Sequence, residues 1–460
     1  MATFLAAATL MITGCASLPD VASATDRPTS SEIVFSNASG QVSVAAAKTA
    51  LRKLEGKDSD SDILVRHLAY EQAVNINSPL VLGNRLTLLQ NGPNTYRAMF
   101  NAIRSAKHHI NLETYIFDDD DIGRQFSALL LERQAAGVQV NVIHDSFGTL
   151  MTPATFFDHL REGGINVLAF NPINPIASNQ REWRLNNRDH RRQLIIDGRI
   201  AFTGGVNISK SYSSAPSGKV KRTRQSASIS ATSWRDTHVQ IEGPVVAEFQ
   251  KLFMDAWKRQ HGPALSSKNY FPELKPRGHE IVRAIGSTSD DTQNPIYLTF
   301  ISAIRHAEKS ISLTVAYFAP DPQLLEALGE AARRGVMVKL ILPSHTDSWA
   351  IRQLGRSHYT DLLRDGVRLY ERRGAIMHAK TACIDDVWST IGSTNLDWRS
   401  FLHNDEINAV ILSRDFAKQM NTMFTQDLEA SDEILLKQWQ RRSWLLRLQE
   451  QIARLGSYWL

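Results

Sequence analysis

Two short segments of the chain carry a histidine, a cation and an aspartate at one spacing. The residues are His190, Arg192 and Asp197 in "DHRRQLIIDG", and His378, Lys380 and Asp385 in "HAKTACIDD". In a strand, residues i and i+2 point to one face, so each histidine and its cation could address the same anion. Histidine serves as nucleophile or as general acid near neutral pH, and two histidines can hold opposite protonation states. With two cations, they suit the displacement of an alcohol from a phosphodiester.

An asparagine extends this spacing in both segments. Asn207 follows His190 by 17 residues, and Asn395 follows His378 by 17 (207 − 190 and 395 − 378). A single motif of this kind is weak evidence, because a strand with a satisfied histidine is the commoner explanation. Two copies in register within a longer repeat indicate a duplicated site.

The elements around the motifs repeat as well. "AIRSAKHHINLETYIF" (102–117) aligns with "AIRHAEKSISLTVAYF" (303–318), and "LLLERQAAGVQVNVIHD" (129–145) aligns with "LGEAARRGVMVKLILPS" (328–344). Each copy reads as the end of an amphipathic helix, a turn and an apolar, β-branched strand. Alternating helices and strands of this length predict parallel strands with crossover helices. We therefore expect two duplicated α/β/α sandwich domains, packed face to face with pseudo-two-fold symmetry around one site.

Length and composition agree with two domains. The chain has 460 residues, of which 43% are hydrophobic and 22% charged, which excludes a disordered or fibrous protein. Its net charge of +5 suits an anionic partner. The predicted boundaries are a signal-like segment (1–15), a flexible linker (16–49), a first domain (50–262), a connector (263–278), a second domain (279–432) and a basic amphipathic helix (433–460).

The first residues, "MATFLAAATLMITGC", form an apolar run too short to span a bilayer. The run resembles the signal peptide of bacterial lipoproteins, although no Lys or Arg precedes it. The resemblance implies that Cys15 is lipidated and tethers the protein to a membrane of the cell envelope on the periplasmic side. The alternative is an ordinary hydrophobic N-terminus. With Cys15 lipidated, Cys383 has no partner for a disulfide, and we expect it to be buried in a strand.

The motifs identify the chain as similar to the phospholipase D superfamily, and within it to the bacterial cardiolipin synthases. The resemblance covers most of residues 80–430 and rests also on "NLETYIF", "WRDTHVQIEGPVV", "GSTNLDWRSF" and the following "NDE". The lipoprotein-like start and "LNNRDHRR" are most similar to the C-type subgroup. The resemblance implies a phosphatidyltransferase that makes cardiolipin from phosphatidylglycerol and a second phospholipid. The candidates for the donor are phosphatidylglycerol and phosphatidylethanolamine.

The resemblance also implies a role for each site residue. His190 is the nucleophile that forms a phosphohistidine, and His378 is the acid for the departing alcohol and then the base for the incoming hydroxyl. The other predicted residues are Arg192 and Lys380 with Asn207 and Asn395 for the phosphate oxygens, and Asp236 and Glu406 for orienting the histidines. Arg192 departs from the lysine that is usual in the family, and its planar guanidinium requires a different geometry.

Asp197 and Asp385 belong to the motif but come seven residues after their histidines. An odd separation turns them to the opposite face of a strand, which favours a structural role over direct catalysis. No metal or other cofactor is expected, because histidines and cations already supply the chemistry.

Two features leave alternatives open. The C-terminal segment 435–460 has Trp, Leu and Ile at helical spacing with basic residues between them, which fits either a membrane interface or packing on the second domain. For the function, phospholipid hydrolysis, nuclease activity and a non-enzymatic lipid-binding scaffold remain alternatives to transfer. The membrane is an expected partner and nucleic acid is not.

Overall fold

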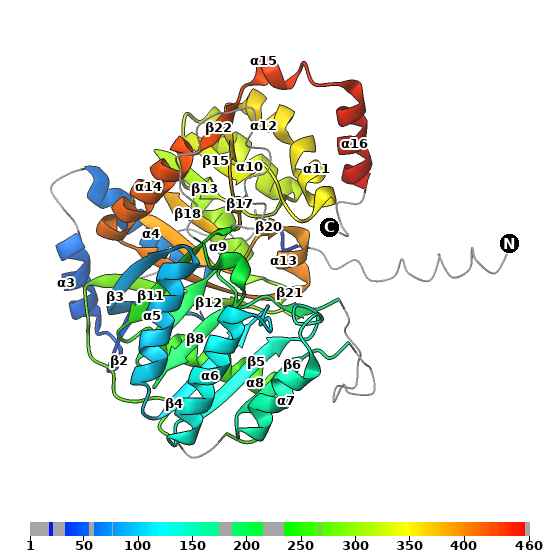
Figure 1. Ribbon diagram of the computed structural model, residues 1–460. Helices are drawn as coiled ribbons and strands as arrows, with labels where there is room; N and C mark the ends of the chain where they lie inside the picture. Colours follow the sequence, from blue (N-terminus) through cyan, green and yellow to red (C-terminus); the bar gives the residue numbers. More distant parts are fainter. Residues whose placement is uncertain are drawn as a thin grey trace, which may run out of the picture.

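The computed structural model describes residues 18–21, 33–54, 59–75, 77–173, 186–214, 234–265 and 268–455. Its two halves repeat one α/β arrangement, stacked one above the other in Figure 1. Cys15 lies outside the described residues. Among the helices that are described, none has both the length and the apolar composition needed to cross a bilayer.

The first half is a seven-stranded sheet covered by helices. Its strands are β3 (Leu80–Gln90), β4 (His109–Thr114), β5 (Gln139–Asp145), β6 (Asn166–Phe170), β8 (Gln193–Ile196), β9 (Ile200–Gly204) and β11 (Thr237–Glu242). Hydrogen bonding gives the order β6-β5-β4-β8-β9-β11-β3, with β4, β5 and β6 parallel and the remaining neighbours antiparallel. The helices are α5 (Asn91–Ser105), α6 (Asp121–Ala135), α7 (Ala154–Glu162) and α8 (Val246–Arg259).

The second half has the same order with one strand added at its outer edge. Its strands are β12 (Glu280–Ser287), β13 (Ser310–Thr314), β15 (Met337–Pro343), β16 (Arg368–Arg372), β18 (Thr381–Ile384), β19 (Trp388–Gly392), β21 (Asn404–Leu412) and β22 (Ser431–Ile434). They are ordered β22-β16-β15-β13-β18-β19-β21-β12. The helices are α9 (Pro295–Arg305), α10 (Pro322–Arg333), α11 (Trp349–Ser357), α12 (Tyr359–Asp365), α13 (Trp398–Leu402) and α14 (Arg414–Glu429). The prediction of a duplicated α/β fold is confirmed. Cys383 is buried in β18, as expected.

The halves are joined along a strand edge as well as at the site. β3 pairs antiparallel with β12, so one continuous sheet runs through both halves. The sequence did not predict this pairing. Because the two strands are equivalent in the repeat, the pairing lies where the pseudo-two-fold relation requires it.

The N-terminal segment differs from the prediction of a linker at 16–49 and a first domain beginning at residue 50. β1 (Phe35–Asn37) pairs with β2 (Gly40–Gln41) and β3, and it is followed by α3 (Val44–Leu54) and α4 (Ser59–Val74). Buried side chains of β1 and α4 join the core of the second half. A three-residue strand is too short to show periodicity, and the partner of α4 lies more than 200 residues along the chain, so neither feature was visible in the sequence.

Buried charges hold α4 against the second half. The Glu71 carboxylate accepts hydrogen bonds from Arg283, at 3.1 Å, and from the indole of Trp388, at 2.8 Å. Both Glu71 and Arg283 are buried. A second ion pair between α4 and the second half, formed by Arg66 of α4 and Glu308, is exposed.

The C-terminal segment also differs from a single helix over 433–460. It contains the end of β22, a short helix α15 (Leu436–Trp439) and the separate helix α16 (Trp444–Leu455). α16 packs on α11, at the outer edge of the second half (Figure 1).

We predict that Glu71→Gln destabilises the protein by about 3–5 kcal/mol, because it leaves the Arg283 guanidinium buried without its counter-charge. Glu308→Gln is the control on the same helix interface. Since the Arg66–Glu308 pair is exposed, its loss should cost about 0–1 kcal/mol. Urea unfolding of both variants measures the difference. Equal shifts would show that the buried pair does not hold the N-terminal segment in place.

Candidate active site

The site is built where two short strands cross between the halves. β7 (Arg188–Asp189) leads into His190 and pairs with the start of β21, while β17 (Ile376–Met377) leads into His378 and pairs with β10 (Trp234–Arg235). The His190 amide donates to Asp405 O at 2.9 Å, and the His378 amide donates to Arg235 O at 2.8 Å. Each histidine therefore sits beside a strand of the opposite half.

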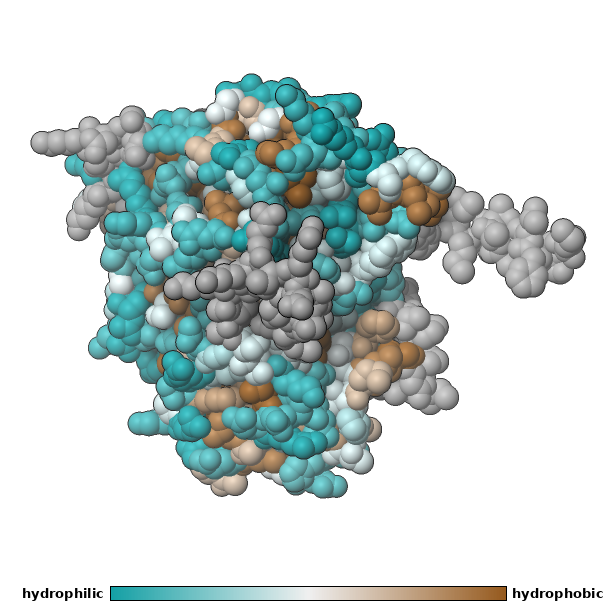
Figure 2. All heavy atoms as spheres, turned by 45° about the horizontal axis from the view of Figure 1, so that its top comes forward, coloured by the Kyte–Doolittle hydropathy of each residue, from teal (hydrophilic) through white to brown (hydrophobic). Residues whose placement is uncertain are grey.

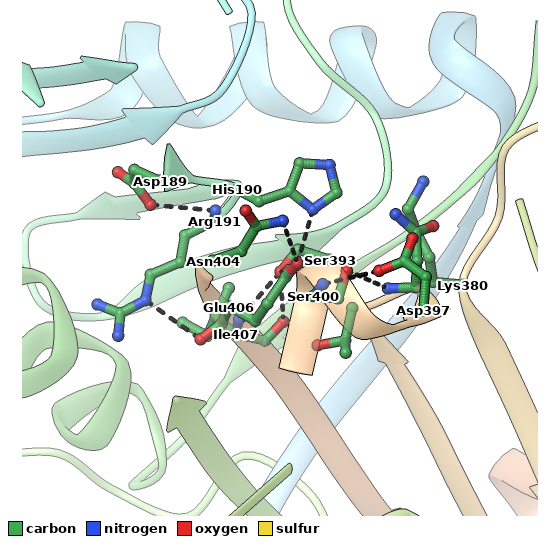
Figure 3. A network of polar contacts seen from close by, with 12 residues as sticks. Asp189, His190, Arg191, Lys380, Ser393, Asp397, Ser400, Asn404, Glu406 and Ile407 are labelled. Atoms are coloured by element: carbon green, nitrogen blue, oxygen red, sulfur yellow. Dashed lines mark hydrogen bonds and ion pairs between the residues drawn. The ribbon is translucent and has the colours of Figure 1, made fainter. Parts of the chain in front are cut away.

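This crossing gives each histidine a carboxylate from the other half. His190 Nδ1 lies 2.9 Å from Glu406 Oε1, and His378 Nδ1 lies 2.7 Å from Asp236 Oδ2. In Figure 3, the His190 ring and the Ser393 hydroxyl both point to the Glu406 carboxylate. The structure thus places both predicted orienting residues in contact with the predicted histidines.

The two cations lie over the other ring nitrogen. Arg192 Nη2 is 2.8 Å from His190 Nε2, and Lys380 Nζ is 3.0 Å from His378 Nε2. Because the Arg192 guanidinium only donates, His190 Nε2 must accept, and its ring proton sits on Nδ1 facing Glu406. Lys380 Nζ also lies 3.1 Å from His378 Nδ1, and it is the Asp236 carboxylate, which only accepts, that places the ring proton of His378 on Nδ1. This tautomer leaves the Nε2 lone pair on the side of the cations, where a phosphate would bind.

Burial and the nearby cations keep both rings neutral. Burial disfavours the charged ring of His190, and Arg192 and Lys380 add like charge, so its pKa lies well below the usual value. Burial and Lys380 likewise lower the pKa of His378 to about 3. Both histidines therefore begin uncharged at neutral pH.

The two carboxylates differ in their proton affinity. Burial alone would raise the pKa of Asp236, but His378 and Lys380 outweigh it and hold that pKa below its usual value. Burial raises the pKa of Glu406 to about 7, even though Ser393 and Arg192 oppose the shift. At neutral pH, Asp236 is ionised while Glu406 is close to half protonated. The symmetric frame thus holds two different dyads.

The asparagines are placed differently from each other. The Asn207 amide oxygen accepts from Arg192 Nε at 2.8 Å, and its amide nitrogen donates to the Tyr212 hydroxyl at 2.9 Å. Asn395 is buried, and its Oδ1 has no hydrogen-bond partner. A buried unsatisfied amide oxygen beside the reactive groups is suited to receive a donor that arrives with the substrate or with a bound water.

Asp197 and Asp385 are not brought to the histidines. Asp197 accepts from the backbone amides of residues 107–109, and Asp385 accepts from those of residues 308–310 and lies 3.0 Å from His67. These amides are at the amino ends of β4 and β13, whereas His190 and His378 lie near their carboxyl ends. We infer that both aspartates anchor the far ends of the motif strands, in line with the structural role that their odd spacing favoured.

Several residues of the site were missed by the sequence reasoning. Tyr115 packs edge-on to His190 with ring centres 5.1 Å apart, and Trp234, Tyr212 and Tyr317 surround His378. Tyr115 directly follows β4 and Tyr317 comes three residues after β13. The signal that could have found them is an aromatic residue after the strand that pairs with each motif strand.

The comparisons with known proteins agree with this geometry. Residues 99–216 and 300–428 match the family model described as "Cardiolipin synthase, PLD-like domain", and each segment contains one histidine motif. The chain is 34% identical to cardiolipin synthase A of Pseudomonas syringae pv. syringae (strain B728a), over 83% of this chain and 76% of the relative. It is 32% identical to the cardiolipin synthase of Geobacillus thermodenitrificans (strain NG80-2), over 85% and 75%. The similarity to the C-type subgroup stays a prediction.

Among solved structures, the chain is similar to the phosphatidylserine synthase of Haemophilus influenzae Rd KW20. The TM-score is 0.64, and the match covers 86% of this chain and all (100%) of that one. At 13% identity, this likeness supports the fold alone.

The pKa of Lys380 predicts an upper pH limit for the activity of this site. Burial lowers the pKa of Lys380 to about 7, with Arg192 acting in the same direction. We predict that kcat/KM on a phosphodiester falls as pH rises above about 7, because Lys380 then loses the charge that holds the phosphate. Lys380→Arg should move this limit to higher pH, since arginine stays charged. A limit that remains near pH 7 in the variant would assign it to another group. The measurement is kcat/KM between pH 5 and 9.

Proposed function

This chain belongs to the cardiolipin synthases with phospholipase D-like domains, and we propose that it makes cardiolipin through a covalent intermediate on His190. The enzyme is a phosphatidyltransferase that acts on phospholipids. In the proposed reaction, a phosphatidyl group passes from one phospholipid to the terminal hydroxyl of phosphatidylglycerol. The observation that carries the proposal is the pair of neutral histidines, each held by a carboxylate of the other half.

In the first step, His190 Nε2 attacks the phosphorus of the donor lipid. The bond between phosphorus and the headgroup oxygen breaks. His378, which takes up a proton from water at Nε2 when the phosphodiester anion binds, gives that proton to the departing alcohol. In the second step, the hydroxyl of phosphatidylglycerol gives a proton to His378 and attacks phosphorus. The bond between phosphorus and His190 then breaks, which restores the starting enzyme.

The different carboxylates support this division of roles. An acid must hold a proton before the reaction, and an ionised Asp236 stabilises the charged form of His378. The phosphodiester anion adds a second negative charge when it binds. A nucleophile must stay neutral, and Glu406 with its pKa near 7 gives His190 weaker support for a positive charge. We therefore assign the acid to His378 and the nucleophile to His190.

Arg192 and Lys380 would hold the non-bridging oxygens of the phosphate. Without substrate, each cation donates hydrogen bonds to the histidine of its own motif, to ring Nε2 and to the backbone carbonyl oxygen. A phosphate that binds between them replaces these contacts and frees both Nε2 atoms. The guanidinium of Arg192 occupies the place equivalent to the Lys380 amine, so the departure from lysine keeps the charge at that point.

The location of the enzyme is part of the proposal. We propose that Cys15 carries a lipid that tethers the protein to the bacterial envelope on the periplasmic side. Cardiolipin synthesis is consistent with such a tether, since both substrates are membrane lipids.

Incubation of the detergent-solubilised protein with phosphatidylglycerol, with and without phosphatidylethanolamine, tests the proposed reaction. We expect cardiolipin by mass spectrometry, together with released glycerol or ethanolamine that identifies the donor. His190→Ala should abolish the product. Phosphatidic acid without cardiolipin would make the protein a hydrolase, and turnover of neither lipid would contradict the proposal.

The covalent intermediate has its own test. If phosphatidyl-His190 forms, labelled glycerol exchanges into phosphatidylglycerol, because glycerol can take the place of the acceptor in the second step. His190→Ala should lose this exchange. Cardiolipin synthesis without any exchange would favour direct transfer between the two lipids.

Arg192→Lys tests the departure from the family motif. We expect cardiolipin synthesis within about tenfold of the unchanged enzyme, since Lys380 performs the same role at the equivalent place. Arg192→Ala should lose about a hundredfold or more, as expected when a charged group that stabilises the transition state is removed. Equal activity of both variants would show that Arg192 does not hold the phosphate. The rate of cardiolipin formation under saturating lipid measures the effect.

A further inference from the structure

Two equivalent loops at the mouth of the active site expose large apolar side chains. One loop follows β5 and contains Phe147, Leu150 and Met151, with Leu150 59% and Met151 90% exposed. The other follows β15 and ends at Trp349, which is 55% exposed at the start of α11. Both loops leave the carboxyl ends of parallel strands. The two histidines lie at this same edge of the sheet.

Each loop rests on the tyrosine beside a catalytic histidine. Gly148 packs so closely on the Tyr115 carbonyl that a Cβ atom at this position would lie 2.1 Å from the oxygen. In the second half, the Tyr317 hydroxyl donates to Asp347 Oδ1 at 2.6 Å. The apolar side chains are therefore fixed to the rim of the reaction centre.

α16 adds a third apolar element next to Trp349. It packs on α11 with one face, through Ala453 against Leu354 and Ile351. Four exposed apolar residues lie on another face of α16: Trp444, Leu448, Ile452 and Leu455, with Trp444 at 75%. Leu445, 51% exposed, borders this face, and Leu446, 37% exposed, lies toward the packed face.

The two faces of α16 are opposed. At 100° per residue, positions i, i+4, i+8 and i+11 from residue 444 fall within one stripe about 80° wide. Glu450 and Ala453, which are buried, lie roughly 180° from the middle of this stripe. Packing among the residues that the structure describes therefore does not account for the stripe. In Figure 2, hydrophobic side chains form a patch at the right-hand edge of the molecule, the edge at which α16 stands in Figure 1.

We propose that the two loops and the outer stripe of α16 form one docking surface for the interface of a phospholipid bilayer. The surface would sit at the level of the headgroups and turn the active site toward them. This inference deepens the proposed function, and it rests on that function in taking bilayer phospholipids as the substrates.

The chemistry of the surface favours a bilayer as its occupant. Trp and Leu side chains on one face of a helix, with Arg447 and Arg454 exposed beside them, match the composition of helices that lie in an anionic lipid interface. The position favours it as well, because the apolar side chains come from both halves and border the site at which a lipid phosphate reacts. Transfer between two lipids can then proceed while the acyl chains stay in the bilayer.

Binding to vesicles of phosphatidylglycerol and phosphatidylethanolamine tests the proposal, in the full chain with Cys15→Ser so that no lipid can be attached there. One variant carries Trp444→Ser, Leu448→Ser and Ile452→Ser, and a second carries Leu150→Ser and Met151→Ser. We expect each variant to have a partition constant for vesicle binding that is roughly tenfold or more lower, since each removes apolar area that enters the interface.

Met337→Ser is the matched control. Met337 is 50% exposed, but it opens β15 at the opposite edge of the sheet from the histidines. We expect this variant to bind vesicles like the parent chain. A loss as large as that of the other two variants would overturn the assignment of the surface.

Two further measurements separate docking from catalysis. Both docking variants should keep their activity on short-chain phosphatidylglycerol that is dissolved as monomers, whereas His190→Ala should bind vesicles and lack all activity. Loss of activity on the monomeric lipid would mean that the substitutions damage the site itself, and would overturn the proposal. Unchanged vesicle binding of both docking variants would also overturn it. So would a lipid-free dimer, detected by sedimentation, that the α16 substitutions dissociate, since a second copy would then cover the stripe.

Discussion

The crossed pairing of histidines and carboxylates is the constraint on which the rest of the structure depends. His190 relies on Glu406 of the second half, and His378 relies on Asp236 of the first. Neither half contains a complete dyad, so the halves must meet with β7 against β21 and β10 against β17. The β3–β12 pairing and the packing of α4 on the second half both fix this meeting. The large shared sheet can be understood as the frame that holds two short strand crossings in register.

Electrostatics at the centre of this frame are unfavourable in the unliganded protein. Arg192 and Lys380 are both buried, and each lowers the pKa of the neighbouring histidines. Arg192 also lowers the pKa of Lys380, since two buried cations close to each other repel unless an anion lies between them. The charge of a phosphodiester relieves this repulsion, and the same charge favours protonation of His378. Substrate binding and the preparation of the acid are thus one electrostatic event.

The sequence predicted the halves and the motif residues because these features occur twice along the chain, and the resemblance to the family implied the orienting carboxylates Asp236 and Glu406. It did not predict which carboxylate serves which histidine, since the crossing depends on strand pairs more than 140 residues apart. β1 and α4 were also missed. The core that they complete belongs to a distant part of the chain, and no local periodicity reveals it. Tyr115 and Tyr317 were missed because their role comes from packing on the histidines and on the loops.

The crossing of the dyads has a consequence for how this protein could evolve. A symmetric dimer of one ancestral domain must use the same residues in both of its halves. Once the two copies are fused in one chain, each mutation affects only one side of the site. Arg192 opposite Lys380, and Glu406 opposite Asp236, are differences that a symmetric homodimer cannot hold. The fusion thus allows two histidines that are equivalent in the repeat to take the different roles proposed for them.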